Sequence, residues 1–286
     1  MKLRSTIDPG KGNSRLSTTY KIAGLVLILA GLLLGLDQFL RTGWLTFVIF
    51  PVCGLFIISF GYYLKSFGWI ITGCVLTGLG FAGFFILGQV WQQSAFTRIG
   101  FAAVAFGLSW LLVALLSYLI HQKVAWWALI PAGVIIGVGA AALFTPTKIV
   151  GYAFLISCGL GVSLLAWGLG ARLFGLIIPG SLLMGIGPGI YFAWRDLIDL
   201  NALAQTGVML VWFAFGWGLI TILARRTSGK FIWWPLIPGG ILAVAGWGLF
   251  IGGDPGNALG FIGNTGSVAM LVFGLYLLLM RKSMHP

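Results

Sequence analysis

The chain has 286 residues, of which 59% are hydrophobic and 8% are charged, and its mean hydropathy is +1.05. A soluble globular protein carries about 25% charged residues, so this composition excludes an ordinary water-soluble domain. The net charge of +12 does not indicate nucleic-acid binding, because the basic residues are concentrated on alternate loops rather than in one patch. We expect an integral membrane protein whose main partner is the lipid bilayer, with no nucleic-acid partner.

Ten segments are long and apolar enough to cross a bilayer, which takes about 20 residues for roughly 30 Å of hydrocarbon. Lipid offers no partner for open backbone groups, so each segment is predicted to be a helix. The expected fold class is all-α integral membrane, with about ten transmembrane helices in five tandem hairpins. In chain order, the spans are predicted at 20–40, 43–64, 67–90, 98–120, 124–144, 149–171, 173–194, 203–224, 231–251 and 263–280.

Two parts of the chain, 65–137 and 172–244, align without a gap at an offset of 107, so that Phe67-Gly68 corresponds to Phe174-Gly175. The offset covers four predicted spans. Because four is an even number, both copies should cross the membrane in the same direction, as the parallel repeats of some transporters do. The predicted organisation is a basic tail at 1–19, a first hairpin at 20–64 and two four-helix repeat units at 65–171 and 172–286.

Basic residues gather on one side of this ten-span path. That side carries 13 of the 17 Lys and Arg residues and one acid, whereas the other side carries four basic and four acidic residues. The positive-inside rule places the basic side in the cytoplasm. We therefore expect a multi-pass protein of the inner (plasma) membrane with both termini in the cytoplasm.

The sequence offers little chemistry inside the spans. No Asp, Glu, Lys, Arg or His lies near the centre of a predicted span, where such residues usually mark function. Cys53, Cys74 and Cys158 fall singly in separate spans, without the spacing of a metal site or a disulfide framework. No phosphate-binding loop, dinucleotide fingerprint or metalloprotease motif is present. We expect no enzyme, and no catalytic, cofactor-binding or metal-binding residues.

The most polar feature of the predicted outer side is segment 194–201. It is interpreted as a short amphipathic connector, with apolar residues at the interface and charged residues in water. The sharper hypothesis is a small polar site or partner contact formed with other outer residues. The candidate residues are Asp37, Arg41, Arg98, Arg195, Asp196 and Asp199, with Asp254 as a further candidate.

Glycine and proline recur within the predicted spans. Glycine accounts for 44 residues, and small residues let membrane helices approach closely. The GxxxG pairs Gly31/Gly35, Gly133/Gly137, Gly185/Gly189 and Gly248/Gly252 favour packing within the chain, with homodimerisation as the alternative. Three prolines at equivalent depths are predicted to remove a backbone hydrogen bond and kink their helices; they are Pro131, Pro179 and Pro238.

The first hairpin, with Gly24, Gly31, Gly35 and Asp37, resembles the small helical-hairpin domains of bacterial envelope-stress proteins of the LiaI/LiaF type, and Trp234-Pro235-Leu236 is similar to their second helix. The resemblance implies a bacterial, non-enzymatic membrane role and identifies no functional residues. With loops too short for a soluble active site, we expect a structural, accessory or assembly role. The partners would be other membrane-protein subunits or further copies of the chain. The alternative is a transporter or channel for a small neutral or apolar solute.

Overall fold

The structure of the protein is a computed structural model. It describes residues 24, 28, 31–32, 34–40, 45–87, 94–195, 201–229, 232–252, 260, 263, 266 and 270. Regular secondary structure in these ranges is entirely helical. The elements are α2 (Leu45–Leu64), α3 (Phe67–Leu87), α4 (Ala95–His121), the short 3₁₀ helix η1 (Trp126–Ala128), α5 (Leu129–Phe144), α6 (Ile149–Gly170), α7 (Phe174–Trp194), α8 (Ala202–Ser228) and α9 (Leu236–Gly252).

Seven helices are long and apolar enough to cross a membrane: α2, α3, α4, η1 together with α5, α6, α7 and α8. The predicted spans from 43–64 to 203–224 are confirmed as helices of this kind. The ninth predicted span contains α9, a shorter apolar helix of 17 residues. In the predicted span 20–40, the described residues 24, 28, 31–32 and 34–40 are helical, whereas the predicted span 263–280 lies largely outside the described residues.

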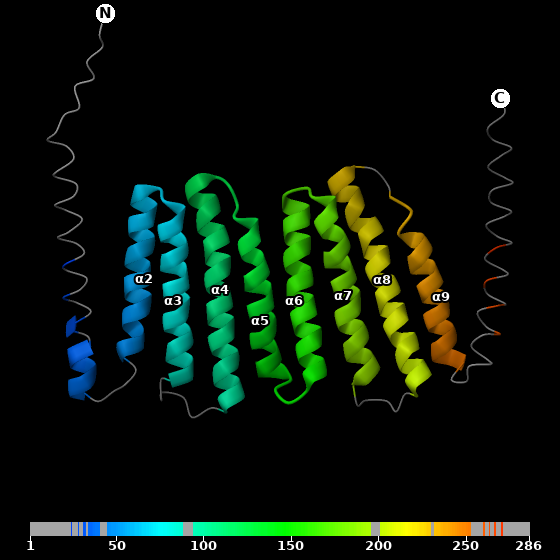
Figure 1. Ribbon diagram of the computed structural model, residues 1–286, viewed down its shortest axis with the longest axis horizontal. Helices are drawn as coiled ribbons and strands as arrows, with labels where there is room; N and C mark the ends of the chain where they lie inside the picture. Colours follow the sequence, from blue (N-terminus) through cyan, green and yellow to red (C-terminus); the bar gives the residue numbers. More distant parts are fainter. Residues whose placement is uncertain are drawn as a thin grey trace, which may run out of the picture. The chain divides into compact units, whose positions relative to one another are not determined.

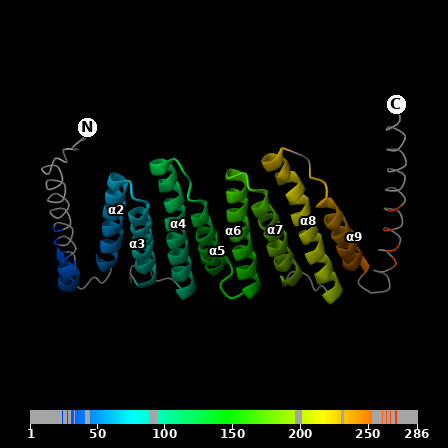
Figure 2. The same cartoon turned by 45° about the horizontal axis from the view of Figure 1, so that its top comes forward.

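The chain forms two compact units, divided between Lys123 and Val124. The first contains α2, α3 and α4, and the second contains η1 and α5 to α9. Within each unit, consecutive helices lie side by side and antiparallel in chain order (Figures 1 and 2). In the second unit, α6 also touches α8. Since the helices mainly contact their neighbours along the chain, much of each helix surface faces outward. The predicted boundary of the repeat units at 171/172 lies inside the second unit.

The bounds of α7 and α8 are those of α3 and α4 shifted by the offset at which the sequence aligns with itself. Both α4 and α8 begin at a capping side chain: Thr97 N donates to Ser94 Oγ at 3.2 Å, and Ala204 N donates to Asn201 Oδ1 at 2.8 Å. A capped first turn satisfies a backbone N–H that has no partner within the helix. The caps explain why α4 starts at Ala95, ahead of the predicted span 98–120.

Glycines set the closest approaches between neighbouring helices. A β-carbon on Gly54 in α2 would lie 2.7 Å from the carbonyl oxygen of Gly73 in α3. The same relation joins α8 to α9, where a β-carbon on Gly246 would lie 2.7 Å from the carbonyl oxygen of Gly207. Backbone atoms cannot move aside easily, so only glycine allows these helices to pack at this distance.

The three prolines expected to kink their helices occupy two kinds of position. Pro131 and Pro238 are the third residues of α5 and α9, and N–H groups in a first turn have no partner within their helix. Both prolines therefore lie near the start of their helices, and kinks at these two positions stay predictions. Pro179 lies inside α7, as does Pro188, and a kink at Pro179 stays a prediction.

Candidate functional site

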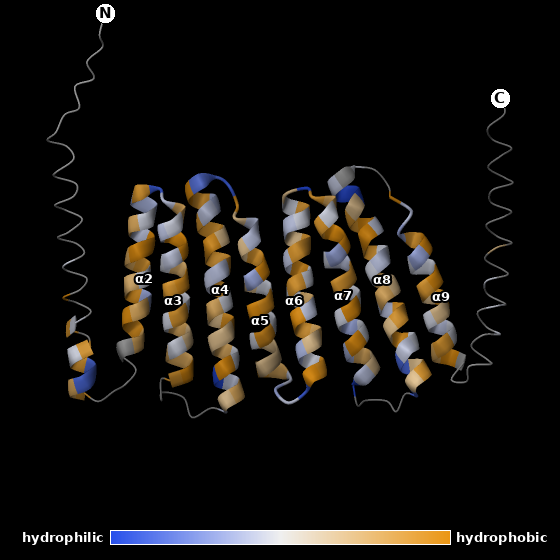
Figure 3. Ribbon diagram, in the orientation of Figure 1, coloured by the Kyte–Doolittle hydropathy of each residue, from blue (hydrophilic) through white to orange (hydrophobic). Residues whose placement is uncertain are grey.

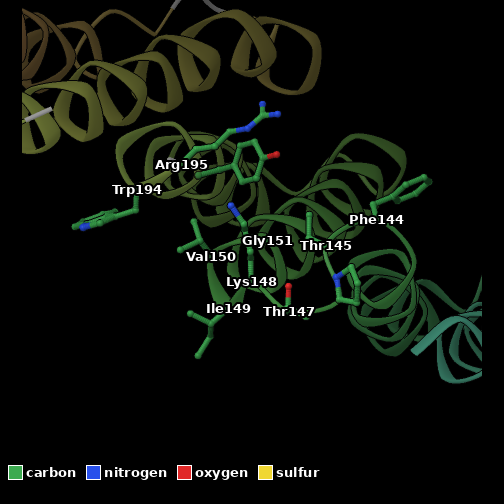
Figure 4. A pocket seen from close by; sticks show the side chains of 11 residues that line it. Phe144, Thr145, Thr147, Lys148, Ile149, Val150, Gly151, Trp194 and Arg195 are labelled. Atoms are coloured by element: carbon green, nitrogen blue, oxygen red, sulfur yellow. The ribbon is translucent and has the colours of Figure 1, made fainter. Parts of the chain in front are cut away.

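A cavity of about 510 Å³ lies in the second unit, where the loop between α5 and α6 meets the end of α7 (Figure 4). It is lined by Phe144, Thr145, Pro146, Thr147, Lys148, Ile149, Val150, Gly151, Tyr191, Trp194 and Arg195. Since these residues stand at helix ends, the cavity lies at the boundary of the spans rather than within them. We refer to it as the end pocket.

The α5–α6 loop holds Lys148 at the start of α6. Thr145 ends α5, with its backbone N–H donating to Ala141 O at 2.8 Å. The Lys148 N–H donates to Thr145 O at 3.2 Å, and the Gly151 N–H donates to Lys148 O at 3.0 Å. A β-carbon on Gly151 would collide with the Thr145 side chain, so glycine permits this tight turn. No side chain caps the first turn of α6.

Aromatic contacts position the second cation of the end pocket. Tyr191 in α7 stacks on Phe154 in α6, with ring centroids 4.8 Å apart. The guanidinium carbon of Arg195 lies 5.2 Å from the centroid of the same Tyr191 ring, within the range of a cation–π interaction. Among the described residues that line the end pocket, two are cations, Lys148 and Arg195.

A second cavity, of about 320 Å³, lies on α7 and α8. Its lining is apolar: Ile186, Gly189, Met209, Leu210 and Phe213. On the same two helices, Phe192 stacks on Trp212 with ring centroids 5.2 Å apart. A cavity without polar groups can hold an apolar chain or methyl group, but it offers nothing to orient a polar solute.

Three polar atoms inside the second unit lack a hydrogen-bond partner among the described residues: Ser181 Oγ in α7, and Trp217 Nε1 and Thr221 Oγ1 in α8. Ser181 is 0% and Thr221 4% exposed. A buried hydroxyl without a partner costs about 1–3 kcal/mol. None of the three residues lines either of the two cavities described above.

The structure places only part of the predicted outer-face set. Arg195 lines the end pocket of the second unit. In the first unit, Arg98 donates from Nη1 to Ile86 O at 3.3 Å, and Asp37 is helical and buried, with 7% of its surface exposed. The remaining candidates, Arg41, Asp196, Asp199 and Asp254, lie outside the described residues.

The sequence-based set missed Lys148, Tyr191 and Trp194 as members of one pocket. A signal for two of them was present, because Lys148 directly precedes the predicted span 149–171 and Trp194 ends the span 173–194, so hairpin geometry brings these two ends to the same side. The position of Tyr191 depends on which face of α7 meets α6. Alternation of spans does not define that face.

No three His, Cys, Asp or Glu side chains in the described part of the chain are close enough together to hold a metal ion. The chain matches no protein-family model, no curated protein and no solved structure. Its class therefore follows from the helices themselves: it is an all-α, polytopic membrane protein.

Proposed function

We propose that the chain is a non-enzymatic structural or accessory subunit of a larger complex in the bacterial plasma membrane. The observation that carries this proposal is the outward exposure of large apolar side chains on helices that pack mainly with their chain neighbours. In α4, Leu108 is 51% and Leu115 is 54% exposed, whereas Val113 is fully buried. Such faces need either lipid or another apolar helix against them.

The short connections support a role that does not require a soluble active site. Residues 65–66 join α2 to α3, residues 145–148 join α5 to α6, and residues 171–173 join α6 to α7. The exposed apolar helix faces are therefore available to a partner. Partner subunits and further copies of the chain could both use these faces, in line with the resemblance to LiaI/LiaF-type hairpin domains.

The charges at the helix ends support cytoplasmic termini. In the second unit, Arg172, Arg225 and Arg226 lie at one end of the helices, and Lys148 and Arg195 lie at the other. The most hydrophilic residues, dark blue in Figure 3, likewise lie near the helix ends. With the basic tails of the sequence included, the first end carries the excess of positive charge expected of the cytoplasmic side.

A tandem duplication accounts for details that hydrophobicity does not require. Lys65 in the α2–α3 turn and Arg172 in the α6–α7 turn are equivalent positions of the aligned copies, and their φ values are 50° and 55°. In both turns the following residue donates its N–H to a glycine carbonyl, from Ser66 to Gly61 and from Leu173 to Gly168. We infer ten spans in five hairpins with a parallel repeat, because unrelated hairpins would not share these turns.

The subunit proposal is tested by purifying the tagged full chain from its native membrane in mild detergent. We expect another membrane protein to co-migrate with it at a fixed ratio on native gels, and the ratio to survive exchange into a second detergent. Recovery of the chain alone would contradict the subunit role.

A transport role is the second candidate, because the buried, unpaired groups of Ser181, Trp217 and Thr221 place polarity inside the spans. It predicts that the chain alone makes liposomes permeable to a small neutral solute such as glycerol, measured by light scattering. A Ser181→Ala/Thr221→Val variant would then change the permeability. Liposomes that stay impermeable to glycerol would count against a channel for such solutes.

A further inference from the structure

Two basic residues occupy a backbone conformation that glycine adopts more easily. Lys65 follows α2 with φ 50°, and Arg172 lies in the turn after α6 with φ 55°. The left-handed conformation brings the β-carbon of an L-residue too close to a backbone carbonyl oxygen, a cost that glycine avoids. Strain of this kind in both turns indicates that the side chain itself is needed there.

A third position in this conformation shows that glycine is accepted in a similar role. Gln122, after α4, has φ 55°, and its counterpart at the offset of 107 is Gly229, with φ 67°. At the turns, by contrast, both copies carry a cation, although lysine in one copy is arginine in the other and the next residue changes from Ser66 to Leu173. The positive charge is therefore a property that the two turns share.

The acids of the chain cannot neutralise these two cations and their basic neighbours. Both side chains are exposed, and no ion pair to either of them is found among the described residues. Four of the five acids lie in the sequence close to the helix ends that point away from the turns: Asp37, Asp196, Asp199 and Asp254. A helix of 20 residues, such as α2, is about 30 Å long, so these carboxylates do not reach the turns. One acid, Asp8, remains for the 13 basic residues expected on the side of the turns.

The turns keep their cations at the level of the lipid headgroups. Each turn joins two spans through two or three residues, so its cation stays close to the apolar chain. Beside Lys65, Tyr62 is 63% and Tyr63 is 70% exposed, and beside Arg172, Leu173 is 47% exposed. Exposed aromatic and apolar side chains next to a cation are typical of the bilayer interface, where Tyr is enriched. The anions found at this depth are lipid phosphates.

We propose that Lys65 and Arg172 bind the headgroups of anionic phospholipids. Each cation pairs with phosphate oxygens, and the exposed side chains next to it contact the upper part of the acyl chains. In the second unit, Arg225 and Arg226 at the end of α8 are exposed at the same end of the helices as Arg172, and they raise the local positive potential. The proposed orientation makes this a lipid of the cytoplasmic leaflet, but the binding itself does not depend on the orientation or on the subunit role.

Native mass spectrometry of the full chain in detergent, titrated with dioleoylphosphatidylglycerol, measures this binding. A basic group near an anionic lipid contributes about fivefold in affinity, so Lys65→Gly and Arg172→Gly should each weaken binding by about that factor. Arg172→Lys should retain binding. Gln122→Gly relieves the same backbone conformation without removing a charge, and Arg98→Gln removes a guanidinium that already donates to Ile86 O. Both of these control variants should bind like the unmodified protein.

A second measurement separates lipid binding from a purely structural role of the cations. A basic residue after a helix also interacts favourably with the last carbonyls of that helix, and this effect is the same with and without lipid. Lipid binding stabilises the folded state only when the lipid is present. Added phosphatidylglycerol should therefore raise the unfolding midpoint of the unmodified protein and of Gln122→Gly equally, and that of Lys65→Gly/Arg172→Gly by less.

Four results would overturn the proposal. The first is equal binding of phosphatidylglycerol by the unmodified protein and the Lys65→Gly/Arg172→Gly variant. The second is an equal rise of the unfolding midpoint in these two proteins, which would leave the helix ends as the reason for the cations. The third is equally tight binding of dioleoylphosphatidylcholine, which has a phosphate but no net charge. The fourth is displacement of the lipid by inorganic phosphate at an equal concentration, which would identify a site for soluble anions.

Discussion

Single glycines determine how closely the helices of each unit approach. Gly73 in α3 faces the backbone of α2, where a β-carbon would lie 2.8 Å from both the Gly54 carbonyl oxygen and the Ile58 nitrogen. Gly180, the equivalent residue of α7, faces α6 in the same way, with Gly161 O at 3.1 Å from the added β-carbon. By contrast, a β-carbon on Gly68, also in α3, would meet nothing within 4 Å. Helix propensity favours alanine over glycine at Gly68, Gly73 and Gly180 alike. The three positions therefore differ only in how closely the neighbouring helix packs against them.

Gly73→Ala should therefore destabilise the protein by about 1–3 kcal/mol, the usual cost of overpacking. Gly68→Ala, on the same helix, should leave stability unchanged or raise it by up to about 1 kcal/mol, because alanine is the better helix former. Reversible unfolding in mixed dodecyl maltoside and sodium dodecyl sulfate micelles measures both free energies. Equal effects of the two substitutions would show that α2 and α3 are not held at the glycine contact.

At the scale of the element, composition predicted the spans well and their ends less well. The spans predicted at 149–171 and 173–194 are α6, Ile149–Gly170, and α7, Phe174–Trp194, because a bilayer demands a fixed length of apolar chain. The span predicted at 231–251 is shortened to α9, which starts at Leu236, directly after Pro235. Local caps and prolines decide such ends, and a hydropathy window averages over them.

The end pocket was less predictable than the spans. The alternation of spans places Lys148 and Arg195 on one side, but the contact of Arg195 with Tyr191 depends on how α6 and α7 are rotated about their axes. That rotation is set by glycine contacts across the interface, such as Gly161 with Gly180. A contact between residues on different helices has no spacing signature in the sequence, unlike a GxxxG pair on one helix.

The residues that follow α4 and α8 lead to a second prediction, about how these helices end. Gln122 follows α4 with φ 55°, and Gly229 follows α8 with φ 67°. Both donate their backbone N–H to the preceding turn, Gln122 to Tyr118 O at 2.9 Å and Gly229 to Arg225 O at 3.2 Å. The left-handed conformation is costly for residues with a side chain and easy for glycine.

Gln122→Gly should therefore stabilise the protein by about 0.5–1 kcal/mol, and Gly229→Ala should destabilise it by about 1 kcal/mol. A β-carbon on Gly229 would meet nothing within 4 Å, so the second effect is conformational rather than steric. The same unfolding titration in mixed micelles measures the free energy of unfolding of both variants. Shifts of the same sign for both variants would mean that the two helix ends are not equivalent.

At the scale of the whole molecule, the inferred repeat predicts the direction in which equivalent helices cross the membrane. Ala95 and Ala202 are the exposed first residues of α4 and α8. Three helices, α5, α6 and α7, lie between α4 and α8 in the chain. If each of the three crosses the bilayer, α4 and α8 run the same way, and the proposed cytoplasmic termini then place both alanines outside. Gln122, at the opposite end of α4, then lies in the cytoplasm.

Cysteines introduced one at a time at these three positions test the arrangement, after the native Cys53, Cys74 and Cys158 have been replaced by alanine. We expect an impermeant maleimide added to intact cells to label Ala95→Cys and Ala202→Cys but not Gln122→Cys, while a permeant maleimide labels all three. Labelling of only one of the two alanine positions would mean that the copies have opposite directions, as in inverted-repeat transporters. Labelling of Gln122→Cys alone would retain the parallel repeat but reverse the whole protein. The end pocket, on the same side of the second unit as Ala202, would then face the cytoplasmic leaflet.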